Sequence, residues 1–159
     1  MTAPLSKNLF IVASPINLMQ IEDMISEYTV HLNTDNPFKT ANNILVDAAK
    51  LGIVTVIKNE FLTNGPESVV EMDFVLSQHA DIFTSAILNV SVQGNQKKGF
   101  LEISLESKTN MVIKETGFFC ASMASYYMEK NYSDVSKRAQ KLASNLEKSF
   151  QDMLGRVVA

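Results

Sequence analysis

Three segments in the middle of the chain alternate between apolar and polar residues, and this pattern constrains the possible fold more than any other feature. They are SVVEMDFVL (68–76), SAILNVSVQ (85–93) and FLEISLES (100–107). Successive side chains of a strand point to opposite faces, so the alternation is typical of strands with one buried and one wet face. GNQKKG (94–99) forms a turn bounded by glycines. The second and third segments are therefore predicted to form an antiparallel hairpin.

The chain before these strands is predicted to contain two short helices. The first begins at Ser14-Pro15, because serine can cap a helix and proline suits its first turn. Short strands are predicted on either side of it, over NLFIVA (8–13) and YTVHL (28–32). The apolar residues of this helix follow at spacings of three and four: Leu18, Ile21, Ile25 and Tyr28.

The second N-terminal helix is predicted over residues 37–51, after an asparagine and a proline that mark its start. Gly52 stands where the C-terminal cap of a helix is expected. IVTVI (53–57) follows directly, and its β-branched residues are apolar on both faces. Such a run is typical of a strand that is buried on both sides.

The C-terminal third is predicted to be a last strand followed by a long helix. The strand spans MVIKETGFFCASMASYY (111–127), and Ser133-Asp134 offers a helix cap. A stripe of apolar residues predicts an amphipathic helix that buries one face. The stripe recurs every three or four positions: Val135, Ala139, Leu142, Leu146, Phe150, Met153 and Val157.

Together these elements predict an α+β fold: a mostly antiparallel sheet with two short N-terminal helices and a long C-terminal amphipathic helix packed on one face. Residues 1–7 are interpreted as a flexible N-terminal tether and residues 8–159 as a single α+β domain. A chain of 159 residues, 46% of them hydrophobic, is long enough to bury one continuous core.

Charge and cysteine content exclude several classes of function. The net charge is −3 and the basic residues are scattered, so no nucleic-acid partner is expected. A single cysteine permits no internal disulfide. One cysteine and two distant histidines show no zinc-type spacing, so neither a metal ion nor another cofactor is expected. The sequence also contains no glycine-rich phosphate loop and no nucleophile-elbow motif.

Cys120 is the one residue with nucleophilic potential. A nucleophilic cysteine needs a lowered pKa, which a neighbouring histidine, a cation or a helix N-terminus supplies. Cys120 instead shares one face of a predicted strand with Phe118 and Ser122, so it is interpreted as a small packing residue. The competing hypothesis is a thiol or acid–base enzyme that uses Cys120 with His31 or His79. No catalytic residue is predicted.

Two pairs of carboxylates share the wet faces of predicted strands: Glu71 with Asp73, and Glu102 with Glu106. Paired carboxylates serve acid–base catalysis when their surroundings separate their pKa values. The alternating pattern favours the simpler interpretation, which is the solvent face of an antiparallel sheet.

A dense group of aromatic residues and methionines before the C-terminal helix is the candidate interaction patch. It forms either core beneath that helix or an apolar surface with tyrosines at its rim, suited to a protein partner or a lipid chain. A second candidate is strand 101–107 or its neighbour, as an exposed edge that adds to a partner's sheet. The patch comprises Phe118, Phe119, Met123, Tyr126, Tyr127, Met128 and Tyr132.

Two segments of the second half of the chain, within residues 85–154, read AILNVSVQGNQKKGFLEISLES and ASYYMEKNYSDVSKRAQKLASNLEKSFQDML. This part of the chain resembles small bacterial envelope lipoproteins of the lipopolysaccharide-assembly and transport-auxiliary type. The resemblance implies a periplasmic α+β domain, tethered to the outer membrane, that is one subunit of a larger envelope assembly. No lipid-accepting cysteine stands near Met1, so the resemblance requires a signal peptide and such a cysteine before residue 1. TAPLSKN would then begin the mature tether.

The sequence therefore leads to one main hypothesis, a non-enzymatic subunit of a bacterial cell-envelope or secretion/transport assembly. Its partners would be other protein subunits, and its contact with the membrane would be limited to a lipid anchor. The alternative is a cytosolic, acidic chaperone or a module that binds an apolar ligand, in agreement with the negative net charge.

Overall fold

The computed structural model describes residues 17–62, 68–81, 84–115 and 121–157. These residues form an α+β fold of five strands and two helices. In chain order the elements are β1 (Asn17–Asn33), α2 (Pro37–Ala48), β2 (Ile53–Leu62), β3 (Val69–Asp81), β4 (Thr84–Asn95), β5 (Phe100–Glu115) and α3 (Ala121–Val157).

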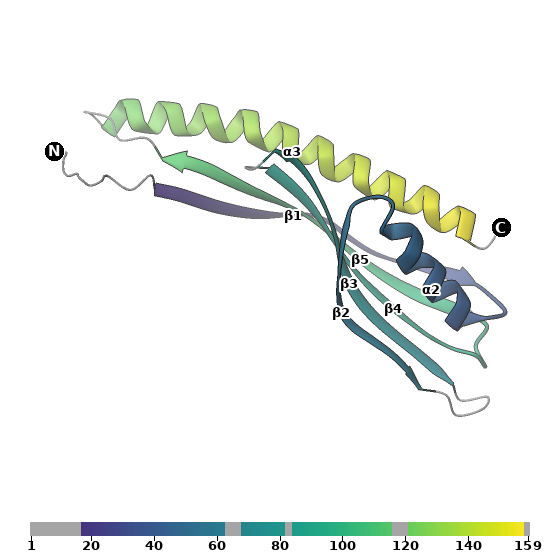
Figure 1. Cartoon of the computed structure of the whole chain (residues 1–159). Helices are drawn as coiled ribbons and strands as arrows, with labels where there is room; N and C mark the ends of the chain where they lie inside the picture. The colour runs from purple at the N-terminus through teal and green to yellow at the C-terminus, as the bar shows by residue number, and fades with distance from the viewer. Residues whose placement is uncertain (1–16, 63–67, 82–83, 116–120, 158–159) are drawn as a thin grey trace.

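The five strands form one antiparallel sheet in the order β1-β5-β4-β3-β2. Strands β2 to β5 follow one another as a meander, whereas β1 pairs with β5, the last of the described strands. The twisted sheet is spanned along its length by α3, and α2 lies beside the C-terminal half of α3 (Figure 1). Both helices contribute side chains to the same core, so they cover the same face of the sheet.

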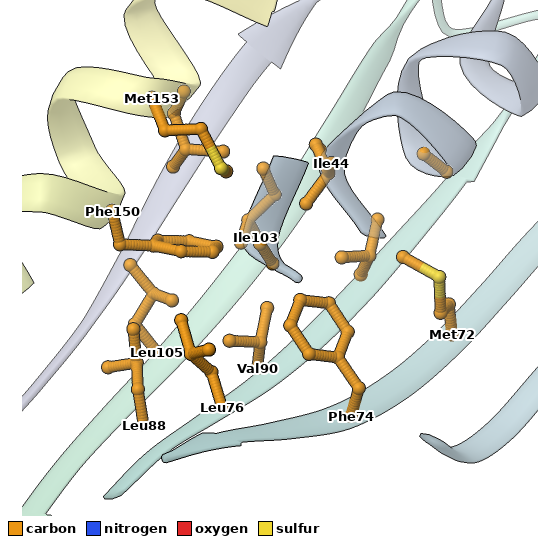
Figure 2. Close-up of a cluster of buried hydrophobic side chains, with 14 of the residues drawn as sticks. Ile44, Met72, Phe74, Leu76, Leu88, Val90, Ile103, Leu105, Phe150 and Met153 are labelled. Atoms are coloured by element: carbon orange, nitrogen blue, oxygen red, sulfur yellow. The ribbon is translucent and has the colours of Figure 1, made fainter. Parts of the chain in front are cut away.

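The core confirms the alternation that the sequence shows. One face of the central strands is buried under the helices, and Phe150 and Met153 of α3 point into it (Figure 2). Ile44 enters the same core from α2. The buried hydrophobic residues of the three central strands are Val70, Met72, Phe74 and Leu76 in β3, Ala86, Leu88, Val90 and Val92 in β4, and Leu101, Ile103, Leu105 and Met111 in β5.

The expectation of two short N-terminal helices is wrong, because the described chain before β2 holds one helix, α2. Residues 17–33, which include most of the first expected helix, form strand β1. A bulge between Met24 and Ser26 explains the misleading pattern. Ile21 and Tyr28 are an odd number of residues apart, and the extra residue of a bulge lets both face the core from a strand. The strand expected over residues 8–13 lies outside the described residues.

The boundary between the last strand and the last helix also differs from the prediction. Strand β5 ends at Glu115, and α3 already begins at Ala121 rather than at Ser133. Residues 121–132, ASMASYYMEKNY, contain neither glycine nor proline, and alanine, methionine, glutamate and lysine favour a helix. The helix therefore continues through the segment whose alternating residues predicted a strand. None of the described helices is long and apolar enough to cross a membrane.

Candidate functional site

The described residues of the predicted interaction patch lie on a helix, and the patch itself stays a prediction. Phe118 and Phe119 lie outside the described residues, as does Cys120. The other five residues lie on the first turns of α3 and not on a strand: Met123, Tyr126, Tyr127, Met128 and Tyr132. Their side chains are outside what the structure describes, so the choice between core and surface stays open.

The two histidines do not come together. His31 lies on β1, where it is exposed and its Nε2 atom is 3.2 Å from Oε2 of Glu102. His79 lies near the end of β3, opposite Ser85. Across the sheet, the strand register places His31 level with Glu71 of β3. Glu71 is eight residues from His79, so the two histidines are about 25 Å apart along the strand direction. Among the described residues, no group of three histidine, cysteine, aspartate or glutamate side chains is arranged to hold a metal ion.

Two of the carboxylates predicted on the wet face, Glu71 and Glu106, form ion pairs with lysines. Lys58 of β2 bonds Glu71, which raises the pKa of the lysine. On β5, the Nζ atom of Lys108 lies 3.2 Å from Oε1 of Glu106 and 3.4 Å from Oε1 of Glu22. Asn89 donates a 3.0 Å hydrogen bond to Glu106. This bond and the one from Lys108 lower the pKa of Glu106, which favours its ionised form and not a role as a proton donor.

The face of the sheet opposite the helices contains a shallow depression of about 630 Å³. Polar and apolar surface line it in about equal parts: carboxylates, hydroxyls and one amide supply the polar part, and Ile57 and Val75 add apolar surface at the β2 side. All five strands contribute to the lining, so the depression follows the curvature of the sheet and depends on no single loop. Its polar lining residues are Glu27, Thr29, Asp73, Asn89, Ser91, Ser104 and Glu106.

Replacement of Asn89 by alanine is expected to raise the pKa of Glu106 toward its ordinary value, because the largest cause of the lowering is removed. A lowered pKa in the folded state adds stability above the ordinary glutamate value, about 4.3, and this stability is lost as the pH falls through the folded value. As the pH falls from the ordinary glutamate pKa to the pKa of Glu106 in the folded wild type, the variant should therefore lose less stability than the wild type. An NMR titration of the side-chain carboxyl carbon of Glu106 would measure the change directly.

Ser91→Ala is the matched control, because Ser91 lies on the same strand and in the same depression as Asn89. The pKa of Glu106 should stay unchanged in this variant. An equal pKa in Asn89→Ala and in the wild type would show that the amide does not hold the carboxylate in solution.

Strand β2 carries the largest exposed apolar surface near the sheet edge. It pairs with β3 on one side, and no other strand that the structure describes pairs with its outer side. On the face away from the helices, the exposed fractions are 59% for Ile53, 67% for Ile57 and 62% for Leu62. Val56 and Phe61 are exposed on the helix side. A strand at the sheet edge thus displays apolar residues on both faces.

The sequence prediction missed this surface in two ways. Residues 53–57 were expected to be buried on both faces, but they lie in an edge strand that runs on to Leu62. The expected edge was strand 101–107 or its neighbour: strand 101–107 lies inside β5, between β1 and β4, and of these two neighbours β1 is an edge strand. The useful signal was an apolar run continued by KNEFL, in which two charged residues alternate within otherwise β-rich sequence.

Comparison with known proteins gives no family for this chain. No protein-family model matches it, and no curated protein matches it either. Among solved structures, it is similar to the crystal structure of Ara h 8.0201, with 12% sequence identity, 86% of this chain and 99% of that chain covered, and a TM-score of 0.27. With so low a TM-score, the likeness supports no inference about fold or function. The geometry of the chain itself is the remaining guide.

Proposed function

We propose that the protein is a non-enzymatic subunit of a bacterial cell-envelope or secretion/transport assembly, and that it acts through protein–protein contacts at β2. The observation that carries the contact is the exposed edge of this strand. An edge strand offers a row of backbone donors and acceptors to an incoming strand, and apolar side chains beside it supply affinity. The envelope assignment is supported by the resemblance of residues 85–154 alone.

The alternative, a cytosolic chaperone, uses the same feature. An extended segment of an unfolded client would add to β2 as a further strand, with its side chains against Ile57 and Phe61. A carrier that holds its ligand between helix and sheet is less well supported. That space is filled in the described structure by Leu76, Leu105 and Phe150, each at most 1% exposed. Cellular location therefore separates the envelope subunit from the chaperone.

The location is tested by fractionation of the native host with an antibody, with and without an inhibitor of the lipoprotein signal peptidase. The proposal expects the protein in the membrane fraction and a heavier precursor under the inhibitor. Protein in the cytosol that does not respond to the inhibitor would contradict the envelope assignment and favour the chaperone.

The contact itself is tested in the same cells with a photo-crosslinking amino acid in place of Ile57. A specific crosslinked product is expected there, because Ile57 is exposed beside the open strand edge. The matched control places the same amino acid at Gln140, an exposed position of α3. Equal crosslinking at both positions, or none at either, would show that the β2 edge is not a contact surface.

A further inference from the structure

We infer that the occupant of the β2 edge is a second copy of this chain, paired antiparallel with Asn59 opposite Asn59 of the partner. The inference rests on the proposed function, since it names the partner of the contact surface described there. Two five-stranded sheets would then join into one continuous antiparallel sheet across a two-fold axis.

The register follows from the only two charged residues of β2, Lys58 and Glu60. Both lie on the face away from the helices, because they pair with Asp73 and Glu71 of β3. In a two-fold antiparallel pair centred on Asn59, each Lys58 stands opposite the partner's Glu60, so two opposite-charge pairs form. These pairs lie on one face, where opposite charges stabilise neighbouring strands.

Neighbouring registers lose this complementarity. A centre on Lys58 places two lysines opposite each other, and a centre on Glu60 does the same with two carboxylates. Like charges directly opposite each other destabilise a strand pair. Registers centred nearer Ile53 place the charged residues opposite apolar residues or beyond the paired segment. The centre on Asn59 is the register that places a lysine opposite a glutamate at both positions.

Two features of β2 that oppose indiscriminate pairing agree with this register. The strand has a bulge between Val56 and Lys58, and a lysine near its middle. Bulges and lysines are devices that prevent edge strands from adding to unrelated strands. Here the bulged residue, Ile57, lies outside the segment 58–60, and the lysine, which already pairs with Glu71 of its own chain, also meets the partner's Glu60. The bulge and the lysine therefore disfavour pairing with an arbitrary strand, and the charge pattern favours a second copy.

The exposed apolar residues explain what would stabilise the pair beyond its charges. Ile57 precedes the segment 58–60 and Phe61 follows it, so antiparallel pairing brings each beside the other copy. The partner would cover Ile57 and Leu62, which are 67% and 62% exposed in the single chain. Both copies keep their helices on the same side, because a two-fold axis perpendicular to the sheet preserves its faces. The two depressions described above then lie on the same face of the joined sheet.

The first test uses charge variants of the whole chain in sedimentation equilibrium. The wild type should dimerise, and K58E or E60K alone should each weaken dimerisation at least about tenfold, since both cross-strand pairs become repulsive. A mixture of K58E and E60K should form a heterodimer, because every pair is then complementary again. Rescue in the mixture also shows that both variants are folded. A wild type that is monomeric at all concentrations, or a mixture without rescue, would overturn the inference.

The second test reads the register directly. Asn59→Cys in a C120A background should form a disulfide-linked dimer on oxidation with copper phenanthroline, because opposite residues of an antiparallel pair have Cβ atoms about 5 Å apart. Thr55→Cys in the same background is the control. Two copies of residue 55 would lie eight residues apart along the strand, so no link is expected. Equal linking at both positions would contradict the register.

The crosslinking at residue 57 distinguishes the failure of this inference from that of the proposed function. A product of twice the mass of the chain, recognised by its own antibody alone, supports a second copy. Crosslinking to another protein, with a purified chain that stays monomeric, overturns the second copy and leaves the proposed contact surface intact. The absence of any specific product would contradict both the second copy and the proposed contact surface.

Discussion

Phe150→Ala is expected to lower the free energy of unfolding by about 3–5 kcal/mol, the range for large aromatic residues removed from a packed core. Phe150 is fully buried and lies with its ring centroid 6.4 Å from that of Phe74. It joins α3 to the centre of the sheet, where side chains from β3, β4 and β5 surround it (Figure 2). Truncation leaves a cavity that these neighbours fill only in part.

Urea unfolding followed by circular dichroism would measure the loss, with an unchanged m value as evidence for the same two states. Ser144→Ala is the control, because Ser144 is an exposed residue of the same helix and its replacement favours helix. Its effect should stay within about 0.5 kcal/mol of zero. A loss below about 1 kcal/mol for Phe150→Ala would mean that α3 does not pack on the sheet as described.

Gly52→Ala and Gly155→Ala are expected to change stability in opposite directions, although the chemical change is the same. A methyl group on Gly52 would collide with the backbone oxygen of Ser77 in β3, and would crowd Gln78 and Leu76. Backbone cannot move aside cheaply, so we expect a loss of about 2–3 kcal/mol. A methyl group on Gly155, in α3, meets no atom within 4 Å. Its gain should be about 0.5–1 kcal/mol, the helix preference for alanine over glycine.

Thermal and urea unfolding of the two variants and the wild type would settle this prediction. Similar small effects in both variants would show that residue 52 does not lie against β3. The prediction also corrects the role of Gly52, which the sequence assigned to a helix cap. Among the described glycines, only Gly99 has a positive φ, of 71°, so Gly52 is required by close approach of the backbone.

The central strands were predictable because a local rule decides them. Alternation with a period of two is visible within nine residues, and the buried face of β3 follows it from Val70 to Leu76. Helix α2 was predictable for the same reason: Asn36 accepts a hydrogen bond from the amide of Lys39, and Pro37 occupies the first turn. Both signals depend on neighbours in sequence.

The errors arose where partners distant in sequence decide the structure. β1 is a strand because β5 pairs with it along its length, and the bulge near Ile25 hides its period of two. The position of β2 at the sheet edge depends on the order of all five strands, which periodicity within one segment does not contain. The candidate contact surface was missed for this reason. The predicted patch around Phe118 remains a prediction, because its side chains lie outside the described residues.

The pairing of β1 with β5 also sets an order of events during synthesis. Asn17 pairs with Glu115 and Asn33 with Phe100, so the first described strand must wait for the last one to leave the ribosome. The hairpins of β2 to β5 close short loops and can form earlier, whereas the long closure of β1 is slow. Until then β5 is itself an open edge beside β4, competent to pair with strands of other nascent chains. A chaperone that holds residues 17–33 extended until β5 emerges would therefore speed correct folding more than one that binds α3.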